Sequence, residues 1–149
     1  MLAIALQQSD TENIMLVNSR DGLDELSNTC ENDITWISNS KIKRVSFHPR
    51  EVGIELTKLE NLMVDSKEGS IRDTLQVIYG VADKPKQDIA ILNASAALVI
   101  GKESGSFREG VELAREAVRD GRAQKLLSKY IQRCGQKEIL MDAEKRFLQ

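Results

Sequence analysis

The sequence predicts an α/β domain in which helices outweigh strands. Runs of β-prone residues are confined to the first part of the chain, at Asn13–Asn18, Ile34–Ile37 and Ile42–Phe47. In the later part of the chain, apolar residues recur with the spacing of a helix face in one segment after another. We therefore expect a short sheet that contains a hairpin and is surrounded by about six helices.

Length and composition are those of an ordinary globular domain. The 149 residues suit one domain, and 41% of them are hydrophobic and 30% charged. A net charge of -2 argues against a dedicated binder of nucleic acid or of anionic membranes. The two cysteines, Cys30 and Cys134, lie far apart and outside any Cys-x-x-Cys motif, which argues against a disulfide framework or a structural zinc site. The start of the sequence carries no secretory signal, so we expect a cytoplasmic protein without a membrane partner.

The first predicted elements are a helix over Met1–Gln8 and a buried strand over Asn13–Asn18. The strand leads directly into a polar loop, Ser19–Glu25, which contains the turn-forming pair Asp21-Gly22. In open α/β sheets, ligands bind at the carboxyl ends of strands. The loop is therefore in position to form a binding site.

A hairpin is predicted between Ile34 and Phe47, where two β-prone runs flank Ser38–Lys41 and Asn39 can adopt the turn. A basic group lies along and after the second run, and consists of Lys41, Lys43, Arg44, His48 and Arg50. Protection of a solvated edge strand accounts for this group, and phosphate binding is the alternative. The only histidine, His48, lacks a second histidine or a Ser/Cys constellation nearby, so we assign it no catalytic role.

The segment that organises the fold is Gln87–Ile100, in which ten of fourteen residues are apolar. It is too long for an ordinary strand and too short to span a membrane, so it predicts a core helix covered on every side. Its small residues Ala90, Ala94 and Ala97 follow helical spacing and allow close approach of neighbouring elements. We expect Asn93 to be a buried polar group with its hydrogen bonds satisfied.

Spacing and capping signals predict four further helices. The first, Glu68–Tyr79, can close at Gly80 in a left-handed C-terminal cap. The next follows Ser106–Glu109, which has the form of a capping box. The last two lie on either side of Gly135. The apolar faces predicted for these three later helices are Phe107, Val111, Ala114 and Val118; Ala123, Leu126, Leu127, Tyr130 and Ile131; and, within Gln136–Gln149, Ile139, Ala143 and Phe147.

Asp24 and Glu25 are the residues most suited to chemistry. Adjacent carboxylates on a loop after a buried strand can direct oxygen ligands at a hard cation. Magnesium prefers oxygen ligands, retains several waters and commonly shares its coordination shell with a substrate phosphate. The alternative is that this pair is solvated surface charge. No other residue is assigned a catalytic or cofactor-binding role.

Three sequence blocks favour the interpretation of Asp24 and Glu25 as metal ligands. They are DGLDELS at Asp21–Ser27, LNASAAL at Leu92–Leu98 and FREGVELAREAVRDGRA at Phe107–Ala123. In this order and at about this spacing, they resemble anthranilate phosphoribosyltransferase. The segment FHPREVG at Phe47–Gly53 is similar to a further segment of that family, with Val52 in place of the usual aromatic residue. The resemblance extends over roughly Met1 to Tyr130.

The resemblance implies that residues 1–149 are the C-terminal portion of a larger α/β domain of the phosphoribosyltransferase and nucleoside-phosphorylase type. It also implies transfer of a 5-phosphoribosyl group from phosphoribosyl pyrophosphate to anthranilate, a step of tryptophan biosynthesis. In the family, the Asp-Glu pair holds magnesium on the pyrophosphate, and we carry this role over to Asp24 and Glu25. The complete protein is then expected to be a homodimer.

Several family features are absent from this sequence: the Gly-Thr-Gly-Gly-Asp loop, the Lys-His-Gly-Asn segment and the N-terminal helical domain. We therefore expect the isolated chain to be inactive, with an exposed apolar face where the missing N-terminal half packs. Smaller departures are Asn18-Ser19 before the DGLDE loop, Asn32 after it, and Gly69-Ser70 at the head of the next helix.

Two alternatives remain from the sequence. One is a non-catalytic binding module of the same superfamily, with nucleic acid as its candidate ligand, and the acidic charge balance argues against this ligand. The other is a relative of pyrimidine nucleoside phosphorylases, which would need a phosphate-binding sequence of its own.

Overall fold

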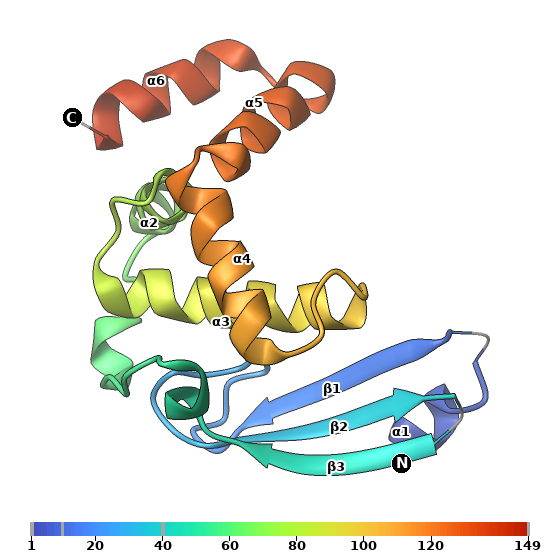
Figure 1. Cartoon of the computed structure of the whole chain (residues 1–149). Helices are drawn as coiled ribbons and strands as arrows, with labels where there is room; N and C mark the ends of the chain where they lie inside the picture. The colour runs from blue at the N-terminus through green and yellow to red at the C-terminus, as the bar shows by residue number, and fades with distance from the viewer. Residues whose placement is uncertain (1, 10, 40, 149) are drawn as a thin grey trace.

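The computed structural model describes residues 2–9, 11–39 and 41–148. Figure 1 shows a curved molecule, with the sheet at one end, the last helices of the chain at the other end and further helices between them. Three strands and six α-helices occur among the described residues, so the predicted fold class is confirmed. No helix in these ranges is both long and apolar enough to cross a membrane. The elements are α1 (Leu2–Leu6), β1 (Asn13–Ser19), β2 (Asn32–Ser38), β3 (Lys41–Phe47), the 3-10 turns η1 (Pro49–Val52) and η2 (Leu59–Asn61), α2 (Lys67–Tyr79), α3 (Lys84–Ile100), α4 (Phe107–Arg119), α5 (Arg122–Cys134) and α6 (Lys137–Phe147).

The three predicted strands form one antiparallel sheet in the order β1-β2-β3. The register pairs Ser19 with Asn32 across β1 and β2, and Asn32 with Phe47 across β2 and β3. In the turn between β2 and β3, Asn39 has a φ of 48°, the left-handed conformation that asparagine tolerates. The hairpin prediction is therefore confirmed, although Ser40 of the turn lies outside the described residues, as do the outermost residues of the two terminal predictions, Met1 and Gln149.

The hydrophobic core joins the sheet to the helices that lie over it. The aromatic rings of Phe47, at the end of β3, and Phe107, at the start of α4, pack with their centroids 4.8 Å apart. Because these residues belong to the sheet and to a helix, the core fixes one relative to the other. The buried members of the core are Leu26, Ile34, Phe47, Val52, Ile54, Ile91, Leu92, Ala96, Val111 and Ala114.

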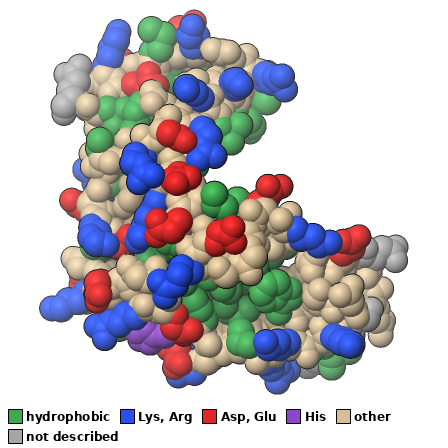
Figure 2. All heavy atoms as spheres, viewed as in Figure 1, with side chains coloured by type: hydrophobic (Ala, Val, Ile, Leu, Met, Phe, Trp, Pro, Cys, Tyr) green, Lys and Arg blue, Asp and Glu red, His purple; other side chains and the backbone are tan. Residues whose placement is uncertain are grey.

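The prediction that the core helix is covered on every side is wrong. One face of α3 is buried, but Ala94 and Ala97 on another face are exposed. Together with Ala90 and residues of α2, α4 and α5, they line an open and mainly apolar groove of about 630 Å³. Figure 2 shows the molecule hollowed on the side where α5 overhangs α3. The structure therefore has an exposed apolar face, while its packing against the missing N-terminal half stays a prediction.

Two predicted caps have different outcomes. Gly80 ends α2 with a φ of 72°, as its left-handed cap requires. The Oγ of Ser106 accepts a hydrogen bond from the backbone N–H of Glu109 at 3.2 Å, which is one half of the predicted capping box. The other half is wrong, because Glu109 accepts its bond from the N–H of Gly105, at 2.7 Å, and not from Ser106.

The last two helices are placed as predicted, but their apolar faces are only partly buried. Leu126 and Tyr130 of α5 are 69% and 62% exposed, and Ile139 of α6 is 64% exposed. The predicted apolar faces are therefore present, but at these three positions they are exposed. The helix α6 instead packs on α2, where the hydroxyl of Tyr79 donates to Glu144.

Candidate metal-binding loop

The loop between β1 and β2 is organised around the carboxylate of Asp21. This carboxylate accepts hydrogen bonds from the hydroxyls of Ser19, Ser27 and Thr29 and, at 3.2 Å, from the backbone N–H of Leu23. Burial alone would raise the pKa of the Asp21 carboxyl, but these bonds hold its pKa well below the usual range. Asp21 is therefore an anion whose acceptor positions serve the loop itself.

Two buried asparagine side chains stabilise the same loop by hydrogen bonds. Asn32 is fully buried; its Oδ1 accepts from the N–H of Ser27 at 2.7 Å, and its Nδ2 donates to the Ser27 carbonyl at 3.0 Å. Asn28, also fully buried, donates from Nδ2 to the carbonyl of Pro85, in the first turn of α3, at 2.9 Å. Asn32 thus has a structural role here.

A third asparagine holds the loop from the middle of α3. The Oδ1 of Asn93 accepts from the N–H of Leu26 at 2.9 Å, and its Nδ2 donates to the Leu26 carbonyl at 2.8 Å. The same Nδ2 lies 3.1 Å from Oε2 of Glu25. The prediction that the hydrogen bonds of Asn93 are satisfied is confirmed, but the residue is half-buried and not buried. Its partner, the acidic loop, was not predicted.

Asp24 and Glu25 project from this anchored loop, and both are exposed. Asp24 has no hydrogen-bond or ion-pair partner among residues 2–9, 11–39 and 41–148. Desolvation raises the pKa of the Glu25 carboxyl, and the negative charges of Asp24 and Asp21 raise it further. The loop therefore concentrates negative charge that a bound cation would stabilise.

The donor set fits magnesium better than a closed metal site. Within the described ranges, no group of three or more His, Cys, Asp or Glu side chains could hold a metal ion together. A structural zinc site needs four such ligands, whereas magnesium is commonly bound by one or two carboxylates, with waters and substrate phosphates completing its shell. Asp24 and Glu25 can supply those two carboxylates, while Asp21 is occupied by its hydrogen bonds.

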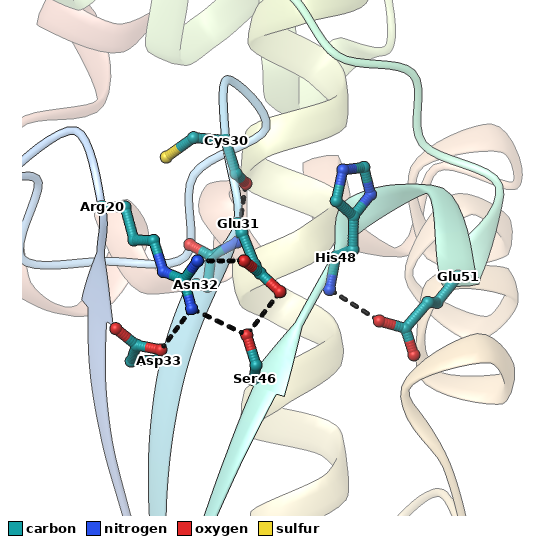
Figure 3. Close-up of polar contacts among 8 residues, drawn as sticks. All are labelled: Arg20, Cys30, Glu31, Asn32, Asp33, Ser46, His48 and Glu51. Carbon is teal, nitrogen blue, oxygen red and sulfur yellow. Dashed lines mark hydrogen bonds and ion pairs between the residues drawn. The ribbon is translucent and has the colours of Figure 1, made fainter.

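The basic residues near the sheet do not extend this loop into a phosphate site. Figure 3 shows Arg20 directed at the carboxylates of Glu31 and Asp33, with Ser46 completing the network. His48 caps η1: its Nδ1 accepts from the N–H of Arg50 at 3.2 Å, and its own N–H donates to Glu51 at 2.7 Å. Its role is therefore structural. Lys41, Lys43 and Arg44 lie exposed on the outer strand β3, as expected of edge protection.

Comparison with protein families matches residues 1–124 to the glycosyl transferase family, a/b domain. The chain belongs to this family. Among curated relatives, it is 31% identical over 134 residues to anthranilate phosphoribosyltransferase of Nitrosopumilus maritimus, and 35% identical over 123 residues to that of Bacillus licheniformis. These matches cover 90% and 83% of this chain, but the chain spans only 38% and 36% of the two relatives.

Solved structures give the same result for this member of the glycosyl transferase family. Anthranilate phosphoribosyltransferase from Thermus thermophilus superposes with a TM-score of 0.72 and 28% identity, over 80% of this chain and 35% of that one. The Saccharomyces cerevisiae enzyme in complex with phosphoribosyl pyrophosphate and magnesium has a TM-score of 0.71 and 22% identity, over 79% of this chain and 34% of that one, and supports the shared fold. The resemblance predicted from the three sequence blocks is confirmed.

Proposed function

We propose that the protein to which this chain contributes transfers a 5-phosphoribosyl group from phosphoribosyl pyrophosphate to anthranilate in tryptophan biosynthesis. The observation that carries the proposal is the pair Asp24 and Glu25 on a loop anchored by Asp21 and Asn93. Support comes from the curated relatives reported above, which are both named for this reaction. The complete protein is then a cytoplasmic homodimer, and anthranilate is the acceptor.

In this proposal, Asp24 and Glu25 are the protein's ligands for magnesium (Mg²⁺). Magnesium bound there would stabilise the negative charge that accumulates on pyrophosphate as the glycosidic bond breaks. The chain's own contribution is to fix the backbone of the loop that carries both carboxylates before the substrate arrives. A site fixed in advance loses little free energy to rearrangement during the reaction. Asp21 contributes indirectly, because its four hydrogen bonds keep the turn of the loop in one conformation.

The groove on α3 has a place in the same proposal. Its lining is mainly apolar, and Ala94 and Ala97 expose helix surface that soluble domains normally cover. We assign this surface to the N-terminal half of the family's α/β domain, which carries the Gly-Thr-Gly-Gly-Asp and Lys-His-Gly-Asn segments. The isolated chain is therefore expected to be inactive.

Neither alternative function gains a specific observation: the acidic loop opposes binding of nucleic acid, and neither relative reported above is named as a phosphorylase.

Reconstitution tests this proposal. The chain is mixed with the N-terminal portion of the Bacillus licheniformis relative, and loss of anthranilate fluorescence is followed with phosphoribosyl pyrophosphate and magnesium present. We expect turnover by the mixture and none by the chain alone. Asp24→Asn with Glu25→Gln should lower the rate about 100-fold or more, the scale expected when stabilisation of developing charge is lost.

The matched control neutralises Glu138 and Asp142, an exposed acidic pair on α6 far along the chain from the loop. Glu138→Gln with Asp142→Asn should leave the rate of the mixture unchanged. Equal rates for the two double variants would contradict the assignment of Asp24 and Glu25. Robust turnover by the isolated chain would contradict the division of the site between two segments.

A further inference from the structure

Asn93 bonds to the backbone of the loop and also to the exposed carboxylate of Glu25. Its Nδ2 lies 2.8 Å from the Leu26 carbonyl, 3.0 Å from the Ile89 carbonyl and 3.1 Å from Oε2 of Glu25. An amide nitrogen has two hydrogens, so three acceptors at these distances must share them. The Glu25 carboxylate is thus tied through one oxygen, while Oε1 has no hydrogen-bond partner among the described residues.

The backbone around this contact is held more firmly than the contact itself. The Leu26 side chain is fully buried, and both polar groups of its backbone bond to Asn93. Residue 26 therefore cannot shift without breaking core packing and two hydrogen bonds. Glu25, its direct neighbour, leaves the backbone at a fixed point, and the bond from Nδ2 limits where its flexible side chain can lie.

We propose that Asn93 is a positioning residue, which orients the Glu25 carboxylate so that a free oxygen faces a divalent cation. The proposal rests on the proposed function, since it assumes that Glu25 is a metal ligand. Residues that orient metal ligands by hydrogen bonding typically change metal affinity by about 10- to 100-fold when they are removed. If Asn93 only tethered the loop, its removal would change metal affinity whether or not Glu25 is present. If Asn93 is a positioning residue, its removal changes metal affinity only while the Glu25 carboxylate is present.

The chain offers a matched control in Asn28. Both asparagines join the loop to α3 by side-chain hydrogen bonds, Asn93 by two bonds to Leu26 of 2.9 and 2.8 Å and Asn28 by one bond to Pro85 of 2.9 Å. Among the described residues, Asn28 has no hydrogen bond to Asp24 or Glu25. Asn28→Ser therefore removes a tether of similar kind at the N-terminal end of the same helix. Asn93→Ser removes the tether and the contact with Glu25 together.

The experiment measures binding of Mn²⁺, used as a paramagnetic substitute for magnesium, to the 149-residue chain by electron paramagnetic resonance. We expect Asn93→Ser to weaken Mn²⁺ binding about tenfold or more, and Asn28→Ser to weaken it far less. In a Glu25→Gln background, Asn93→Ser should add nothing beyond the effect of Asn28→Ser, because the carboxylate that Asn93 orients is gone. Equal effects of the two serine variants would overturn the positioning role.

A second measurement needs no substitution at residue 93. The NMR signals of the Asn93 side-chain amide should shift in Glu25→Gln and stay in place in Asp24→Asn, and unchanged signals in both would overturn the proposal. The Mn²⁺ measurements also distinguish the positioning role of Asn93 from the metal site itself. Normal Mn²⁺ binding by Asn93→Ser, with binding lost in Asp24→Asn, removes the positioning role and leaves the metal site. No Mn²⁺ binding by the unmodified chain removes both.

Discussion

Gly110 of α4 crosses α3 against the backbone of Ser95, so closely that a Cβ on residue 110 would lie 2.9 Å from the Ser95 carbonyl oxygen. Ser95 is fully buried, and its Oγ donates to the Leu92 carbonyl at 2.6 Å. The two helices that build the core thus meet at a glycine and a serine. The small residues that matter for this crossing lie on the buried face of α3, not on its alanine face.

We expect Gly110→Ala to destabilise the chain. The added methyl group meets backbone atoms, which cannot rotate away, so the helices must separate. Overpacking of this kind lowers the free energy of unfolding by about 1 to 3 kcal/mol, which outweighs the gain in helix propensity of about 1 kcal/mol. Chemical denaturation of the variant and the unmodified chain measures the difference. A variant of equal or higher stability would show that α3 and α4 are not in such close contact.

The anionic state of Asp21 predicts a dependence of stability on pH. Its pKa is lower in the folded chain than in the unfolded chain, so its contribution is fully present above the unfolded pKa of about 4 and is lost as pH falls below it. Asp21→Asn should cost about 2 kcal/mol at neutral pH, since charge-assisted hydrogen bonds are lost. The difference in the free energy of unfolding between the two proteins should shrink below about pH 4. A difference that stays constant with pH would contradict this account.

The contact between α2 and α6 predicts a tyrosine that loses its proton at a higher pH than a free tyrosine does. Burial, followed by the hydrogen bond to Glu144, raises the pKa of Tyr79 to about 12. Because the folded pKa lies above the unfolded value of about 10, the neutral phenol stabilises the fold below pH 10, and this contribution is lost between about pH 10 and 12. In an absorbance titration, Tyr79→Phe should therefore lack the transition near pH 12. Tyr130→Phe, at an exposed position, is the control and should keep it.

The open groove should bind an apolar fluorescent dye, because exposed apolar surface of this kind is rare on soluble domains. Ala94→Glu with Ala97→Glu should abolish the dye signal with little loss of stability, since both positions are exposed. Gln132→Glu, an exposed position of α5 outside the groove lining, is the control. A signal that survives the double substitution would place the dye, and the exposed apolar surface, elsewhere.

Local sequence signals predicted the elements and left their partners open. Periodicity and the Gly80 cap located α2, and the apolar run Gln87–Ile100 located α3, because these signals depend on residues close in the chain. Periodicity cannot tell whether an apolar face has a neighbour, which is why the coverage of Ala94 and Ala97 was predicted wrongly. For the same reason, periodicity placed Leu126 on an apolar helix face and could not show that this position is exposed.

The candidate site shows the same division. Asp24 and Glu25 follow from the residue types and the DGLDE block, both of which are local. The support from Asn93 could not be predicted, because it spans 67 residues to Leu26 and depends on how α3 crosses the loop. The rule that pointed to the loop concerns parallel strands, whereas the described sheet is antiparallel. Hydrogen bonds within the loop and contact with α3, and not sheet topology, fix the loop here.

The most direct test of the central claim is binding of a divalent cation by the loop. Mn²⁺ binding to the unmodified chain is compared with binding to Asp24→Asn with Glu25→Gln, and to Glu138→Gln with Asp142→Asn as the charge-matched control. The account predicts that the loop variant weakens binding at least about tenfold and that the control leaves it unchanged. Equal binding by the unmodified chain and the loop variant would contradict it.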